Sequence, residues 1–112
     1  MRRIWVAALA LATVAAPVAA QEPALSAIQE QGRKLFQSTC LYCHGEKVWG
    51  TFTLARRRAD EGLLEKRTDL NAPFVKNVVR NGVGSMPAYR RTELTDADVD
   101  AIAAYLTRPR SK

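Results

Sequence analysis

The 112-residue chain is poor in side chains that bind metals or take part in redox chemistry: it has one histidine, two cysteines and two methionines. A structural zinc site needs four protein ligands, and two cysteines with one histidine leave the fourth position empty. Alternating strand patterns of useful length are also missing, which predicts an all-α fold. Beyond the first 20 residues, no run is apolar enough to cross a bilayer. The sequence therefore argues against a zinc domain, a β-rich fold and a membrane domain.

The scarce residues gather in the pentapeptide Cys40-Leu41-Tyr42-Cys43-His44, which contains both cysteines and the histidine. This Cys-x-x-Cys-His order is the attachment signature of a c-type haem. The two thiols can each add to one vinyl group on the same porphyrin edge, and the histidine then presents its imidazole to the iron. Met86 is the only methionine besides the initiator. A thioether is the usual ligand opposite histidine in electron-transfer cytochromes.

Two alternatives apply to these residues. A redox disulfide between Cys40 and Cys43 would also use Cys-x-x-Cys spacing. However, the βαβ pattern that accompanies it is missing, and it would leave His44 and Met86 without a role. Met86 alone could be a core-filling side chain, but it lies in a glycine-rich loop that ends in Pro87. We therefore predict one covalent haem, with His44 and Met86 as axial iron ligands.

Residues 1–20 have the pattern of an export signal. Two arginines precede an apolar run, and small residues at 18–20 form a cleavage site. An uncleaved anchor helix is the alternative, but the run is short for a span and Pro17 interrupts it. We expect residues 21–112 to form one small domain that is soluble in an oxidising compartment, the periplasm of a bacterium.

The chain is moderately basic. Its net charge is +6, and it falls to +4 when Arg2 and Arg3 are removed with the signal. This charge is consistent with a solvated surface, with steering toward an acidic redox partner, or with nucleic-acid binding. Export and the lack of a nucleic-acid motif argue against the last.

Two of the predicted helices lie at the ends of the domain. The first spans 24–36 and carries Gly32 on the same face as its apolar residues Leu25, Ile28, Leu35 and Phe36. A glycine inside a helix costs about 1 kcal/mol relative to alanine, so close approach by another helix is the expected reason. The last helix begins at the N-cap Thr95, with Leu94 packing on Val99 and Pro109 after its end.

A third helix is predicted between the haem motif and Met86. Asn71 caps it, Asn81-Gly82 ends it, and four apolar residues form its buried face: Phe74, Val75, Val78 and Val79. A further short helix is expected within 53–64, with loops over 45–51 and 82–92.

The order of these parts is informative. Gly32-x-x-Leu35-Phe36 precedes the haem motif, Met86-Pro87 follows it, and the last helix ends in Tyr105-Leu106. In this order the whole domain resembles a class I cytochrome c. The resemblance implies that Cys40 and Cys43 form thioether bonds, that His44 and Met86 bind the iron, and that the terminal helices cross where Gly32 and Phe36 meet Tyr105 and Leu106. Many members also have a proline after the haem motif, whose carbonyl accepts a hydrogen bond from the histidine ring. The loop 45–51 has none.

A narrower set of motifs accompanies these. It consists of Gly50-Thr51-x-x-Leu54-Ala55-Arg56-Arg57, Arg67-Thr68-Asp69-Leu70, and Val78-Val79-Arg80-x-Gly82 ahead of Met86-Pro87. In these the chain is similar to the small cytochrome subunit of p-cresol methylhydroxylase and eugenol hydroxylase-type flavocytochromes. The resemblance implies that it accepts single electrons from a flavin subunit that oxidises a 4-alkylphenol.

An iron bound by both His44 and Met86 has no open position, so we expect an electron carrier and not an enzyme. It would take electrons from a flavoprotein dehydrogenase subunit and pass them to a downstream acceptor, with Tyr89, Arg90 and Arg91 as a candidate contact surface. One alternative is a free-standing diffusible carrier for another dehydrogenase or a respiratory chain. Another is a haem-based ligand sensor or minor peroxidase, if Met86 is displaced.

Overall fold

The computed structural model describes residues 22–58 and 62–110. The regular elements in these ranges are helices, and the strand-like pairing in them is limited to an isolated bridge between Val83 and Met86. The predicted signal peptide lies outside the described residues. The elements in chain order are α1 (Ala27–Leu35), the π-helical turn η1 (Phe36–Cys40), α2 (Leu41–His44), α3 (Trp49–Ala55), the 3-10 turn η3 (Leu64–Lys66), α4 (Ala72–Asn81) and α5 (Asp96–Leu106). The predicted all-α fold is confirmed. None of the described helices is long and apolar enough to cross a membrane.

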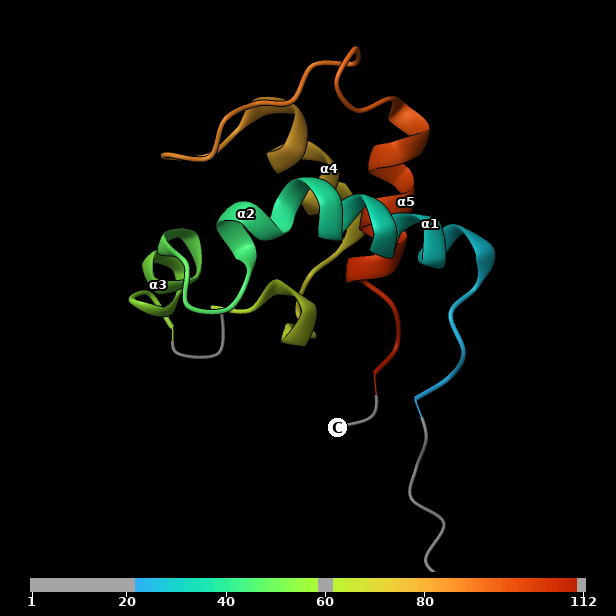
Figure 1. The fold of residues 1–112 in the computed structure, drawn as a ribbon, viewed down its shortest axis with the longest axis horizontal. Helices are drawn as coiled ribbons and strands as arrows, with labels where there is room; N and C mark the ends of the chain where they lie inside the picture. Colours follow the sequence, from blue (N-terminus) through green and yellow to red (C-terminus); the bar gives the residue numbers. More distant parts are fainter. Residues whose placement is uncertain (1–21, 59–61, 111–112) are drawn as a thin grey trace, which may run out of the picture.

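The crossing of α1 and α5 forms the centre of the fold (Figure 1). Gly32 lies at the crossing point: a Cβ atom placed on it would be 1.9 Å from the carbonyl oxygen of Ala101 and 2.9 Å from the Cβ of Tyr105. The rings of Phe36 and Tyr105 pack nearby, with centroids 6.0 Å apart. The predicted contact between the terminal helices at Gly32 and Phe36 is confirmed.

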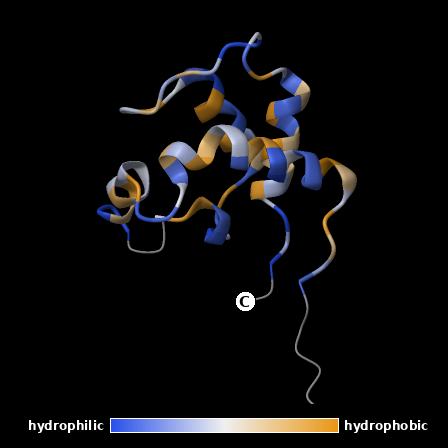
Figure 2. Ribbon diagram, in the orientation of Figure 1, coloured by the Kyte–Doolittle hydropathy of each residue, from blue (hydrophilic) through white to orange (hydrophobic). Residues whose placement is uncertain are grey.

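The hydrophobic core lies where α1, α4 and α5 meet, and Figure 2 shows hydrophobic residues gathered there. Its buried members come from α4 and α5, from the π turn and from the segment before α5: Phe36, Val75, Val79, Leu94, Val99, Ile102, Ala103, Tyr105 and Leu106. The burial of both Leu94 and Val99 agrees with the predicted packing at the start of the last helix.

Helix α5 begins with a reciprocal capping box. The Thr95 hydroxyl accepts a hydrogen bond from the Asp98 N–H at 3.2 Å, and the Asp98 carboxylate accepts one from the Thr95 N–H at 2.9 Å. Two N–H groups that the helix itself leaves without acceptors are thereby satisfied. The cap fixes the first residue of the helix that carries most of the core.

We expect Thr95→Ala to lower the free energy of unfolding by about 1 kcal/mol, because an alanine cannot cap the Asp98 N–H. Guanidinium denaturation followed by circular dichroism measures the change. Thr92→Ala is the control, since Thr92 is exposed and lies outside the capping box. Equal stability changes in the two variants would contradict the role of the cap.

Helix α4 begins and ends as predicted. The Asn71 side chain accepts a hydrogen bond from the Phe74 N–H at 2.9 Å, and Gly82 follows the helix with φ +71°, a left-handed value that suits glycine. Its buried face is narrower than predicted, because Val75 and Val79 are buried whereas Val78 is half-buried and Phe74 is 50% exposed.

Two other expectations were wrong. The first helix begins at Ala27 behind the N-cap Ser26, so Leu25 precedes it, and Ile28 is 48% exposed because α5 covers the side of α1 that carries Gly32. The short helix expected within 53–64 instead starts at Trp49 and ends at Ala55, shortening the predicted 45–51 loop.

Candidate haem-binding site

The Cys-x-x-Cys-His motif follows directly from a widened turn at the end of α1. Over Phe36–Cys40 the backbone is π-helical, and the Leu41 N–H donates to the Phe36 carbonyl five residues earlier. Such widened turns often occur at functional sites. The α-helical pattern then resumes over Leu41–His44, and the Gly45 N–H donates to the Leu41 carbonyl at 2.9 Å. The motif is thus presented on short helical turns continuous with the α1–α5 crossing.

The two thiols differ in their surroundings. Cys40 is partly buried against the hydrophobic core, Cys43 is exposed, and the two are not joined by a disulfide. Burial, with a smaller effect from Cys43, raises the pKa of the Cys40 thiol to about 11. Within the described ranges, no three His, Cys, Asp or Glu side chains converge as ligands of a bare metal ion. This arrangement suits two separate covalent attachments better than a zinc site or a redox disulfide.

His44 has one nitrogen directed into the protein. Its Nδ1 atom is buried and has no hydrogen-bond partner among the described residues. Burial lowers the pKa of the imidazole, which favours the neutral form that binds metals. The loop 45–51 has no proline to act as an acceptor, and the other acceptor that would be expected for the ring is not found among the described residues.

Thr51 fixes the loop that follows the motif. Its side chain is buried, and its hydroxyl donates a hydrogen bond to the Gly45 carbonyl at 2.6 Å. Gly45 is the residue directly after His44, so this bond satisfies the first carbonyl after the histidine. Gly50 lies against the motif on the other side, because a Cβ atom there would be 2.2 Å from the Cys43 carbonyl oxygen. Sequence reasoning named Gly50 and Thr51 in the narrower resemblance but gave neither a role. The structure shows that they hold α3 against α2.

We expect Thr51→Val to destabilise the fold by about 1 kcal/mol, because the Gly45 carbonyl loses its partner while the volume is kept. Thermal unfolding followed by circular dichroism measures this change. Thr53→Val is the matched control, since the Thr53 hydroxyl bonds to the Trp49 carbonyl from the exposed side of the same helix. A larger loss in the control would argue against the anchoring role of Thr51.

Met86 is held in a tight turn after α4. Val83 and Met86 exchange two backbone hydrogen bonds, of 3.1 and 2.9 Å, around Gly84 at φ +55°. Gly82 also lies close, because a Cβ atom there would be 2.6 Å from the Met86 carbonyl oxygen. The Met86 side chain packs against the same core as Cys40 and Leu41.

Tyr89 connects this segment to the haem motif. Its N–H donates to the Val79 carbonyl at 2.8 Å, which fastens the segment to α4. Its side chain packs against the hydrophobic core, as the side chains of Cys40 and Met86 also do, and burial raises the pKa of its hydroxyl. The segment that carries Met86 therefore returns to the neighbourhood of the motif.

Several large apolar side chains around these elements are exposed. Trp49 and Phe52 on α3 are 61% and 56% exposed, and Val83, in the turn with Met86, is 52% exposed. Apolar surface of this size suits burial under a large apolar ligand. The two thiols, the neutral imidazole, the thioether and this surface together fit a covalent porphyrin.

Comparison with known proteins decides the family. The family model described as "Cytochrome C oxidase, cbb3-type, subunit III" matches residues 27–106, from the start of α1 to the end of α5. The chain is a c-type cytochrome. Cytochrome c6 of Cyanidium caldarium is 30% identical over 83 residues, which cover 72% of the chain and 71% of the relative. Cytochrome c6 of Gloeothece citriformis (strain PCC 7424) is 30% identical over 92 residues, 80% of the chain and 79% of the relative. No solved structure matches the cytochrome.

The family and the fold confirm the coarse interpretation of the sequence. The cytochrome has the small all-α class I fold, it carries one covalently attached haem c, and it is an electron-transfer protein and not an enzyme. When bound, the haem supplies the one-electron couple between Fe(III) and Fe(II).

Proposed function

We propose that the cytochrome carries single electrons from a flavin-dependent dehydrogenase of the 4-alkylphenol-oxidising type to a downstream acceptor. Cys40 and Cys43 form the thioether bonds, and His44 and Met86 bind the iron. The observation that carries the assignment of these four residues is the packing of the partly buried Cys40 and Met86 against one core, with His44 next to the second cysteine and its Nδ1 atom buried.

The roles of these side chains follow from their chemistry. A buried neutral imidazole is a suitable iron ligand, and a methionine thioether favours the reduced iron and raises its potential. Two protein ligands leave no position for oxygen or a substrate. Specificity then depends on how a partner docks beside the ligands and not on a catalytic pocket.

The proposed place of action is the periplasm. Residues 1–20 are proposed to act as a signal peptide that is cleaved near Ala20, leaving 21–112 as the cytochrome domain, and the motif in the sequence is the support for this. The two thiols must be reduced when they add to the vinyl groups, whereas an oxidising compartment favours a disulfide between them. Mass spectrometry of the exported protein tests the cleavage: the measured mass should equal that of residues 21–112 plus one haem.

The proposal of a flavoprotein partner rests on three sequence motifs, and residues of each motif have a structural role in the fold. Thr51 anchors α3 on α2, Arg67 pairs with Asp69 at 2.6 Å, and Arg80 binds the Tyr89 carbonyl. The motif residues therefore serve the packing of a small cytochrome, and the flavoprotein assignment depends on the resemblance in sequence. A second candidate is a carrier in a respiratory chain, which the name of the matching oxidase-subunit family favours.

An absorption experiment tests the ligands, and a second one tests the partner. The ferrous cytochrome should ignore carbon monoxide, whereas rapid binding would favour a sensor or peroxidase. In a periplasmic extract of the native host, adding 4-methylphenol should reduce the haem and the cytochrome should co-elute with a flavin. Reduction by respiratory donors alone would favour the second candidate.

A further inference from the structure

Helix α3 exposes large aromatic side chains on its outer side. Trp49 and Phe52 are three residues apart, and each is more than half exposed. Arg56 follows on the same side, because its N–H donates to the Phe52 carbonyl at 3.2 Å and extends the helical pattern. Figure 1 shows α3 at the edge of the molecule, away from the α1–α5 crossing. A helix side that is polar in most globular proteins is therefore aromatic here.

The inner side of α3 is turned toward the haem motif. Gly50 lies against the Cys43 carbonyl, and the Thr51 hydroxyl donates to the Gly45 carbonyl. Phe52 lies about 200° around the helix from Gly50, so its ring points away from the motif. A haem attached to Cys43 can cover apolar surface beside the motif, but it leaves this ring exposed. The haem therefore does not account for the exposure of Phe52.

Positive charge accompanies the two rings. Segment 42–58 contains four basic residues and one acidic residue, which are Lys47, Arg56, Arg57 and Arg58 against Glu46. Arg56 and Arg57 are exposed, and no carboxylate in the described ranges lies within ion-pair distance of either guanidinium. An arginine can lay its methylene groups along apolar surface while its guanidinium stays in water. The short segment thus combines exposed rings with unbalanced cations.

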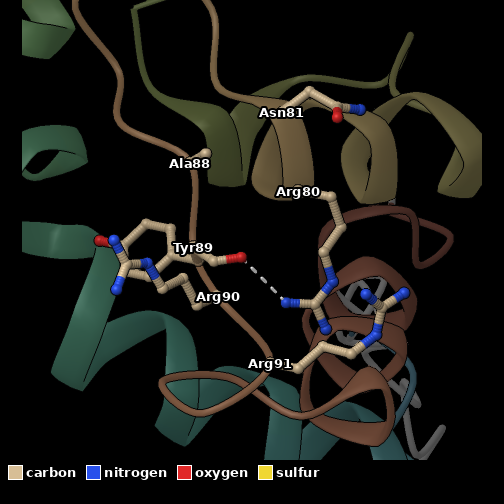
Figure 3. A pocket seen from close by; sticks show the side chains of 6 residues that line it. All are labelled: Arg80, Asn81, Ala88, Tyr89, Arg90 and Arg91. Carbon is tan, nitrogen blue, oxygen red and sulfur yellow. Dashed lines mark hydrogen bonds between the residues drawn. The ribbon is translucent and has the colours of Figure 1, made fainter.

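Another cationic surface of the cytochrome lacks the exposed rings. It is a pocket of about 610 Å³ between the end of α4 and the segment after Pro87, shown in Figure 3. Arg80 donates to the Tyr89 carbonyl there at 3.1 Å, and the half-buried Tyr89 packs against the hydrophobic core. Arg90 is exposed at the pocket and provides a cation without a large exposed apolar side chain in the lining. Charge and exposed aromatic surface coincide at α3.

We propose that the α3 face, formed by Trp49, Phe52, Arg56 and Arg57, adsorbs to a membrane surface of anionic lipids. Tryptophan and phenylalanine rings enter the boundary between headgroups and acyl chains, and nearby cations are attracted to the negative surface. Two rings and two guanidiniums form too small a patch for a specific protein interface, which buries about 800 Å² on each partner. Reversible adsorption to lipid requires only such a patch. The inference goes beyond the proposed function, because adsorption does not depend on which dehydrogenase reduces the haem.

Sedimentation of the purified holoprotein with sucrose-loaded vesicles tests this proposal, with the bound fraction read from the haem absorption of the pellet. Vesicles of equal parts phosphatidylglycerol and phosphatidylcholine should bind the cytochrome at low ionic strength about tenfold more tightly than phosphatidylcholine alone. We expect Phe52→Ser to weaken this binding about tenfold, because a ring no longer enters the lipid boundary. Arg56→Glu should weaken it about tenfold by reversing a charge at the surface.

Two control variants make the same chemical changes elsewhere. Phe74→Ser removes a ring of similar exposure from α4, and Arg90→Glu reverses an exposed charge at the pocket of Figure 3. Both should bind the anionic vesicles like the wild type, and circular dichroism should show that all four variants are folded. Equal weakening in the test and control variants would indicate a general effect of charge and apolar surface and would overturn the proposal.

Two further results would assign the α3 face differently. A wild type that does not sediment with the anionic vesicles would overturn adsorption to lipid directly. Sedimentation velocity without lipid tests for a second copy of the chain on the same face. A concentration-dependent dimer that Phe52→Ser abolishes and Phe74→Ser preserves would show that the face is covered by another cytochrome, which would also overturn the proposal.

Discussion

Gly32→Ala is expected to lower the free energy of unfolding by about 2 kcal/mol. Overfilling a tight contact costs up to about 3 kcal/mol, and the better helix propensity of alanine returns about 1 kcal/mol. The contact is tight because the new Cβ atom would lie 1.9 Å from the Ala101 carbonyl oxygen, which belongs to the backbone of α5 and cannot rotate away. Helices α1 and α5 would have to separate to accept the methyl group.

Guanidinium denaturation of the holoprotein, followed by far-ultraviolet circular dichroism, measures this change. Lys34→Ala is the control, because Lys34 is an exposed neighbour in the same helix and alanine there gains helix propensity without a clash. A stabilised Gly32→Ala variant would show that the helices are not in close contact in solution.

The crossing at Gly32 could be predicted because a glycine on the apolar face of a helix has few other physical explanations. The caps could be predicted for a similar reason. Thr95 and Asn71 each place a short polar side chain ahead of a helical pattern, and Gly82 ends one at a positive φ. The capping signals depend only on residues that are adjacent in the chain, so the sequence alone is enough to recognise them.

The burial of individual faces could not be predicted in the same way. Phe74 and Ile28 have the right spacing for a buried face, yet both are about half exposed because the neighbouring helix covers only part of it. The π-helical turn at Phe36–Cys40 has no distinct sequence pattern, since it differs from an α-helix by one residue in a turn. Helix α3 begins at Trp49 without a side-chain cap, and contact with the motif at Gly50 positions it instead.

The candidate site also contains residues that could be predicted from the sequence and residues that could not. The donor set at Cys40, Cys43, His44 and Met86 follows from the scarcity of such side chains and from their order. Thr51 could not be assigned, because its hydrogen bond to Gly45 depends on how the loop folds back. The ion pairs of Asp96 with Arg80 and Arg91 could not be predicted either, since they join the start of α5 to two other segments of the chain.

Met86→Ala is expected to convert the cytochrome into a protein whose ferrous form binds carbon monoxide rapidly. An alanine has no atom that can reach the iron, so one axial position opens, and loss of the thioether lowers the reduction potential. The variant should also lose about 2 kcal/mol of stability, because Met86 packs against the core as well. Absorption spectra with and without carbon monoxide, together with a redox titration, measure the first two effects.

Val83→Ala separates the thioether from the turn that holds it. Val83 is exposed, and both hydrogen bonds between it and Met86 join backbone atoms, so this variant keeps the turn while removing apolar surface beside it. It should remain closed to carbon monoxide. If Met86→Ala also stayed closed, the methionine would be a packing residue and another group would bind the iron, because a six-coordinate haem needs a second strong ligand opposite His44.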